Sequence, residues 1–107
     1  GMTDHGKFIA DAAVCFAIFG EKTAKYYLED CCAATENLII GLWAYGVGSC
    51  WVAGDKKPYA EDIRKLLSVP AEYTLVSLVA AGYPAEVSMQ KKKILDDVTF
   101  FDTYSEK

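Results

Sequence analysis

A glycine-rich stretch in the middle of the chain, GVGSCWVAGDKK over residues 46–57, is the first candidate for chemistry. Glycines allow a backbone to approach a phosphate group or a flat ring closely. The stretch fails two common nucleotide patterns, since Trp51 stands at the last glycine of G-x-G-x-x-G and Asp55 at the glycine that must precede Lys56 in the Walker pattern. Its residues alone leave two interpretations open, a binding loop or a glycine stop for a helix packed on a sheet.

Other groups that could do chemistry are few. The run Lys91-Lys92-Lys93 could hold a phosphate, or it could be a solvated loop. His5 is the only histidine, so it cannot form a metal-binding pair or complete a Ser-His-Asp set. No catalytic residue is assigned, and the reactive atoms of an enzyme built this way are expected to come from a bound cofactor.

Four cysteines raise the question of disulfides. Cys31 and Cys32 are adjacent on a predicted helix, and thiols of cytoplasmic proteins stay reduced. We therefore interpret Cys15, Cys31 and Cys32 as ordinary core residues.

The bulk composition is that of one small globular domain covering residues 1–107. The chain is 52% hydrophobic with a formal net charge of −4, which disfavours a general role in nucleic-acid binding. The apolar run 38–53 is shorter than the roughly 20 residues of a membrane span and contains three glycines. No signal peptide is recognised, and Gly1 is interpreted as the remnant of a tag, so a cytoplasmic protein without membrane contact is predicted.

Hydrophobic patterning predicts the elements that would position these groups. Residues 12–19 and 72–84 are apolar runs typical of strands buried on both faces, and the second is predicted to be central in its sheet. Residues 25–45 follow a helical spacing whose second half is apolar all round, which indicates a helix covered on nearly all sides and a candidate dimer element. Gly46 and Gly48 end this helix, residues 49–53 are extended, and a second helix is expected over 58–67.

Several motifs in this order resemble the C-terminal half of the FMN-dependent nitroreductase family. The helix opens as Asp30-x-x-Ala33-Ala34-x-x-x-Asn37-Leu38, ends at Gly46-x-Gly48-Ser49-Cys50-Trp51, and is followed by Leu66-x-x-x-Pro70 and Gly82-Tyr83-Pro84. The resemblance covers residues 7–103 and implies an α+β fold with a central mixed β-sheet flanked by helices. The segment with an Arg-x-Ser-x-Arg motif, which grips the flavin phosphate in the family, does not occur in this sequence.

The resemblance also implies a cofactor site. Residues Trp51, Val52, Ala53 and Gly54 match the loop that passes the flavin ring, and the backbone N–H groups of Ala53 and Gly54 would face flavin N5. Trp51 or Trp43 would shield the ring. Lys91 and Lys93 match the basic residues placed against the FMN phosphate. NAD(P)H would be the electron donor, and a nitroaromatic, quinone or similar small molecule the acceptor.

The family's members are homodimers whose C-terminal segment adds a strand to the partner's sheet, so residues 94–107 are expected to be a dimer-crossing tail. In the tail, Val98, Phe100 and Phe101 are apolar with no obvious internal partner. The functional prediction is an FMN-dependent NAD(P)H oxidoreductase. The alternatives are a truncated, catalytically silent dimer that keeps only the fold or weak ligand binding, and a fragment of a full-length enzyme.

Overall fold

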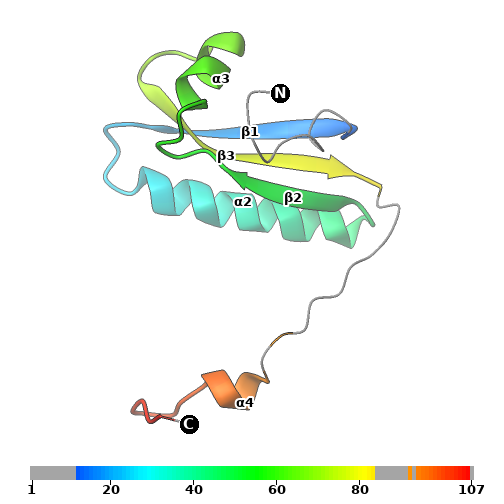
Figure 1. Ribbon diagram of the computed structural model, residues 1–107, viewed down its shortest axis with the longest axis vertical. Coiled ribbons are helices and arrows are strands. Elements are labelled where there is room, and N and C mark those ends of the chain that lie inside the picture. The colour runs from blue at the N-terminus through cyan, green and yellow to red at the C-terminus, as the bar shows by residue number, and fades with distance from the viewer. Residues whose placement is uncertain (1–11, 84–91, 93, 107) are drawn as a thin grey trace.

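The structure, a computed structural model, describes residues 12–83, 92 and 94–106. Its elements are, in chain order, β1 (Val14–Glu21), α2 (Tyr27–Ala44), β2 (Gly48–Ala53), α3 (Ala60–Leu66), β3 (Tyr73–Gly82) and α4 (Leu95–Val98). Figure 1 shows β1, β3 and β2 side by side, α2 running along them, and α3 at one end of the sheet. The predicted helices and strands are therefore confirmed, with boundaries that differ by a few residues.

The strand that comes last in the sequence, β3, is the central strand of the sheet. The strand order is β1-β3-β2, and β3 pairs antiparallel with both neighbours. Seven consecutive residues of β3, from Leu75 to Ala81, are buried, as expected for a strand covered on both faces. The α+β class and the central position of this strand are confirmed. Both strand pairs in the described ranges are antiparallel, whereas the sequence prediction had a mixed sheet.

The first strand is at an edge, and the prediction that it is buried on both faces was wrong. Val14 is 49% exposed and Phe16 37% exposed. The reason is the sheet order, because β3 separates β1 from β2 and leaves one side of β1 without a neighbour among the described residues. An apolar run indicates that a strand is shielded from water, but it does not indicate which element or which chain shields it.

One face of the sheet is covered by α2. The hydroxyl groups of Thr35 on α2 and Ser77 on β3 lie 2.7 Å apart, and both residues are fully buried. The outer side of the same helix is open: Ile40 is 60% and Trp43 56% exposed. The expectation that the second half of this helix is covered on nearly all sides is not met within one chain, because a helix packed on one sheet face contacts it along one stripe only.

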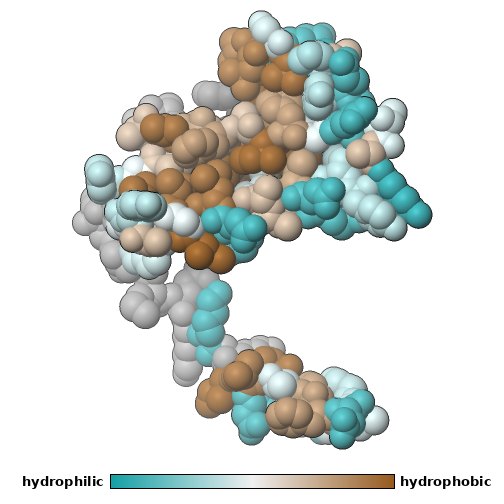
Figure 2. All heavy atoms as spheres, turned by 180° about the vertical axis from the view of Figure 1, so that it is seen from behind, coloured by the Kyte–Doolittle hydropathy of each residue, from teal (hydrophilic) through white to brown (hydrophobic). Residues whose placement is uncertain are grey.

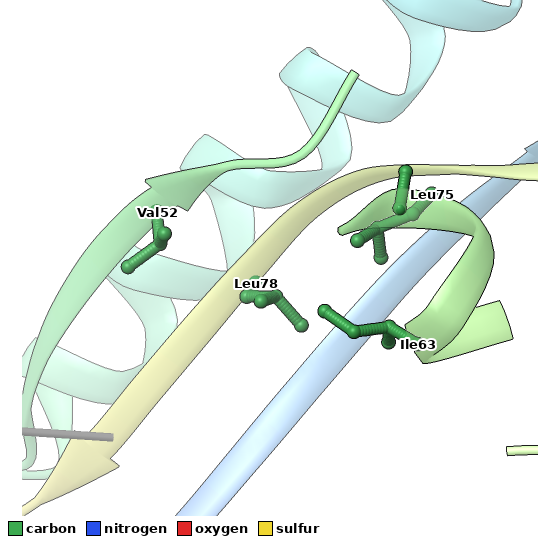
Figure 3. Packing of buried hydrophobic residues seen from close by; sticks show 5 residues of the cluster. Val52, Ile63, Leu75 and Leu78 are labelled. Carbon is green, nitrogen blue, oxygen red and sulfur yellow. The ribbon is translucent and has the colours of Figure 1, made fainter. Parts of the chain in front are cut away.

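The opposite face carries the hydrophobic core. Neighbouring residues of a strand point to opposite faces, so Leu78, next to Ser77, points away from α2. There it joins Val52, Ala60, Ile63 and Leu75, and Figure 3 shows Ile63 of α3 reaching toward Leu78 and Leu75. Helix α3 therefore closes this face near the start of β3.

The C-terminal segment stands apart from the sheet and its helices in Figure 1. Residues Leu95–Val98 form one helical turn, Phe101 is 85% exposed, and the rings of Phe100 and Tyr104 lie 4.6 Å apart. No residue from 99 to 106 is in a strand of this chain. A strand needs a neighbour to satisfy its backbone, so the predicted exchange of this tail with a partner chain stays a prediction.

Candidate functional site

The candidate site is the end of β2 and the turn that follows it. Along β2 the side chains alternate between the two faces, so Val52 points into the α3 core and is 8% exposed, while Trp51 and Ala53 share the other face. Trp51 is 37% exposed, and Ala53 is exposed as well. Of the four residues predicted to line a flavin, two are therefore open to solvent by their side chains, and Val52 and Gly54 are buried.

Near the turn, one backbone N–H group of this segment, that of Ala53, points away from β3. The N–H groups of Gly54 and Asp55 both donate to the carbonyl of Val76, at 3.0 and 3.1 Å. Antiparallel pairs alternate between bonded and non-bonded residues, so Ala53, opposite Ser77, directs its N–H away from β3. It points toward the open edge of β2, where no strand among the described residues pairs with it. The expectation that the Gly54 N–H faces a flavin is corrected here, because that N–H already has a partner inside the sheet.

Gly54 is small for an internal reason. A Cβ atom at this position would lie 2.8 Å from Leu75 Cγ and 3.2 Å from the carbonyl oxygen of Val76. Carbon atoms approach no closer than about 3.5 Å in good packing. The close contact between the turn and β3 therefore accounts for this glycine, and a flat ring outside the chain is not needed to explain it.

Two tyrosines that the sequence analysis did not single out fix the segment. Tyr27, in the first turn of α2, donates its hydroxyl hydrogen bond to Asp55 Oδ1 at 3.1 Å. Tyr59, just before α3, donates its hydroxyl to the carbonyl of Ala53 and packs against the core. Tyr27 and Asp55 are 28 positions apart, so only the folded chain brings them together.

Replacing Tyr27 with phenylalanine is expected to change how stability depends on alkaline pH. The hydrogen bond to the Asp55 carboxylate, together with burial, raises the pKa of Tyr27 above its ordinary value near 10. A raised pKa in the folded state favours the protonated phenol, so its contribution is complete below about pH 10 and is lost as pH rises through the folded value. At pH 8 the free energy of unfolding of the variant should be about 1 kcal/mol lower than that of the wild type.

Chemical denaturation at pH 8 and pH 11 measures this effect. The difference in the free energy of unfolding between wild type and Tyr27→Phe should be smaller at pH 11 than at pH 8. Tyr104→Phe, at an exposed tail position, is the matched control and should show no gap at either pH. A gap that stays constant or widens toward pH 11 would contradict the assignment.

Cys15 and Cys31 are free thiols with little nucleophilic character. Burial raises the pKa values of Cys15 and Cys31, and Cys31 Sγ lies 3.6 Å from the carbonyl oxygen of Phe19. A raised pKa lowers the fraction of thiolate, which is the reactive form. Cys31 and Cys32 are partly buried, while Cys15 is exposed on the edge strand. The prediction that Cys15 is a core residue was therefore wrong for the single chain.

The remaining predicted positions lie elsewhere. Lys91 and Lys93 fall outside the described residues, so their prediction as phosphate contacts is untested, and Lys92 between them is exposed. Trp43 is on the outer side of α2. In the parts of the chain that the structure describes, no group of three or more His, Cys, Asp or Glu side chains is arranged to hold a metal ion.

Comparison with known proteins places these features in a family. The sequence model of the nitroreductase family matches residues 3–83, which includes β1, α2, β2, α3 and β3. The chain belongs to the nitroreductase family. A relative from Archaeoglobus fulgidus, named "Putative NADH dehydrogenase/NAD(P)H nitroreductase", is 29% identical over an alignment of 87 residues that covers 76% of this chain and 50% of the relative. The chain thus spans about half the length of the curated nitroreductase relatives it matches.

Solved nitroreductase-family structures share the fold. A Bacteroides thetaiotaomicron protein of the same name superimposes with a TM-score of 0.84 at 24% identity, over 96% of this chain and 62% of that one. An FMN-dependent nitroreductase from Clostridium difficile superimposes with a TM-score of 0.75 at 22% identity, over 87% of this chain and 59% of that one. At these identities the likeness carries the fold alone. Within the described residues, none of the helices is both long enough and apolar enough to cross a membrane.

Proposed function

We propose that the chain carries the flavin-ring half of an FMN site in an NAD(P)H-dependent oxidoreductase of the nitroreductase type. The observation that carries this proposal is the outward N–H of Ala53 at the open edge of β2, inside the segment that matches the family. The names of the Archaeoglobus relative and of the Clostridium difficile structure, which mention NAD(P)H and FMN, support it. The acceptor would be a nitroaromatic, a quinone or a similar small molecule.

The described residues fit a flat, hydrogen-bond-accepting ring in part. Ala53 offers a backbone donor, and the half-exposed Trp51, two residues earlier on the same face, offers an aromatic surface that keeps water from one side of a ligand. Val52 and Gly54 would serve by placing Ala53, since both are buried against the core and β3. Bound FMN would supply the hydride and electron transfer, while Lys91 and Lys93 would hold its phosphate by charge-assisted hydrogen bonds.

A homodimer is part of the same proposal. The outer side of α2 exposes Ile40, Trp43 and, just beyond the helix, Tyr45, and a Cβ added at Gly41 would meet nothing within 4 Å. Figure 2 shows apolar residues gathered both on the body of the chain and on its C-terminal segment. Exposed apolar area of this kind supports an interface between two chains. The tail would lie across the partner and bury Val98, Phe100 and Phe101 there.

An absorption experiment tests the proposal directly. The purified chain is titrated with FMN and followed in the visible range, and saturable perturbation of the flavin bands is the expected result. Addition of NADPH to the saturated protein without oxygen should then bleach those bands. A spectrum equal to the sum of free FMN and protein at every concentration would overturn the proposal.

A second candidate is a family member that keeps the fold and the dimer without catalysis. It is favoured by the coverage of only about half of the curated relatives. If two or three charged phosphate contacts were supplied by segments outside this sequence, their loss would cost about 3 to 9 kcal/mol, or roughly a hundredfold to a millionfold in affinity. Sedimentation that gives a dimer, together with an FMN titration that gives no spectral change, is the pattern that would establish this candidate.

A further inference from the structure

At the open edge of β2, the N–H groups that no described strand pairs with come at alternate residues. The bonded pair Gly54 and Val76 sets the alternation, so the N–H groups of Ser49, Trp51 and Ala53 all point outward. Their positions differ in how firmly the backbone is held. Ser49 and Trp51 lie along the strand, whereas Ala53 is at its end, where the chain leaves the sheet through Gly54 and Asp55. A donor at a strand end keeps a fixed direction only if the backbone beyond it is anchored.

The Ala53 peptide group is anchored at its carbonyl by Tyr59. The tyrosine precedes α3, and its ring packs on the core cluster formed by Val52, Leu75 and their neighbours. The carbonyl and the N–H of an extended residue point to the same side of a strand, so the Tyr59 hydroxyl lies at the edge to which the Ala53 N–H is directed. Tyr59 therefore occupies the outward acceptor of Ala53, and no described residue takes up its donor.

The chain after Ala53 is held from the other side of the sheet. Asp55 donates its N–H to Val76 and accepts the hydroxyl of Tyr27 from α2. Val76 is the residue at which the pairing of β1 with β3 shifts register, between the pairs Ile18 with Ser77 and Phe19 with Leu75. Its carbonyl accepts from both Gly54 and Asp55. Anchors from α2, β3 and the start of α3 thus converge on three consecutive residues.

We propose that Tyr59 and Tyr27 are positioning residues that aim the Ala53 N–H at a ligand acceptor atom on the open edge of β2. Tyr59 fixes the peptide itself, and Tyr27 fixes the turn that follows. The ligand part of this inference rests on the function proposed above, with the FMN ring as the acceptor. Neither tyrosine is assigned a proton transfer, and neither is placed in contact with the reacting atoms.

The test has a ligand-free measurement and a ligand-dependent one. In the free protein, amide hydrogen exchange at Gly54 and Asp55 should be about 2- to 10-fold faster in Tyr59→Phe than in wild type, since one neutral hydrogen bond is removed. Exchange at Leu78, in the centre of β3, should not change. Tyr26→Phe, which removes a hydroxyl from an exposed ring, is the matched control and should match the wild type throughout.

With FMN added, the amide resonance of Ala53 should shift in wild-type protein, and the dissociation constant should be about 2- to 10-fold weaker in Tyr59→Phe and in Tyr27→Phe. An FMN-dependent shift that survives with unchanged affinity in both variants overturns the positioning role and leaves the proposed function intact. A wild-type resonance that does not move at saturating FMN overturns the proposed function and the ligand part together. Unchanged exchange at Gly54 and Asp55 in Tyr59→Phe overturns the anchoring itself.

Discussion

Thr35→Val is expected to lower the free energy of unfolding by about 1 to 3 kcal/mol, because it leaves the hydroxyl of Ser77 buried without a partner. The single hydrogen of the Thr35 hydroxyl is donated to the carbonyl of Cys31 at 2.7 Å. The contact of 2.7 Å with Ser77 must therefore use Ser77 as the donor. Both residues are fully excluded from water, so a lost partner cannot be replaced by solvent.

The donor order gives a ranking of variants that can be tested. Ser77→Ala should lower the free energy of unfolding less than Thr35→Val does. In Ser77→Ala, Thr35 still donates its hydrogen bond to the carbonyl of Cys31 and loses only the hydrogen bond that it accepts from Ser77. The double variant Thr35→Val with Ser77→Ala should cost less than Thr35→Val alone, since no polar atom is then orphaned. Thr23→Val, where the hydroxyl is exposed, is the matched control and should stay within about 0.5 kcal/mol of wild type.

Urea denaturation at one fixed protein concentration measures these differences, since association would otherwise shift the apparent stability. Single-variant costs that simply add in the double variant would show that the two hydroxyls are not coupled. A Ser77→Ala cost larger than that of Thr35→Val would reverse the donor assignment.

The Thr35–Ser77 pair also shows what can be predicted from the sequence and what cannot. The helical spacing places Thr35 on the same stripe as Cys31 and Leu38, which are partly buried, so its burial can be predicted. Its partner could not be predicted, because Ser77 lies in an apolar strand 42 positions later and nothing in the pattern fixes how strand and helix align. Periodicity gives the face of an element, whereas register belongs to the assembled fold.

The same distinction separates the two apolar strands. Residues 12–19 and 72–84 have similar composition, yet β3 is buried on both faces and β1 lies at an edge with Val14 and Phe16 exposed. Strand order decides this, and strand order depends on connections and on helix packing. At the site, the sequence predicted that the N–H groups of Ala53 and Gly54 both face a ligand. The bond of the Gly54 N–H follows from its pairing with Val76 and could not be predicted, while the role of Ala53 stays a prediction.

Gly54→Ala is expected to destabilise the protein by about 1 to 3 kcal/mol, the usual range for an overpacked position. The new methyl group would lie 2.8 Å from Leu75 Cγ and 2.9 Å from Leu75 Cδ2, inside the core cluster that holds α3 on the sheet. The carbonyl oxygen of Val76, at 3.2 Å, blocks a compensating shift of the turn, because that oxygen also accepts the bonds from Gly54 and Asp55. For a domain of this size, the midpoint of thermal unfolding should fall by roughly 4 to 8 °C for each kcal/mol.

Gly82→Ala is the matched control for Gly54→Ala, because Gly82 is also a sheet glycine and a Cβ there would meet nothing closer than 3.7 Å, the backbone nitrogen of Ala13. It should leave the unfolding midpoint almost unchanged. Shortening the obstructing side chain should rescue the clash, so Gly54→Ala combined with Leu75→Val should lose less stability than the two single variants added together. Because the clash is internal, the loss should be measurable in protein without FMN. A Gly54→Ala protein as stable as wild type in the absence of FMN would contradict this prediction, because it would mean that the contact with Leu75 does not require a glycine.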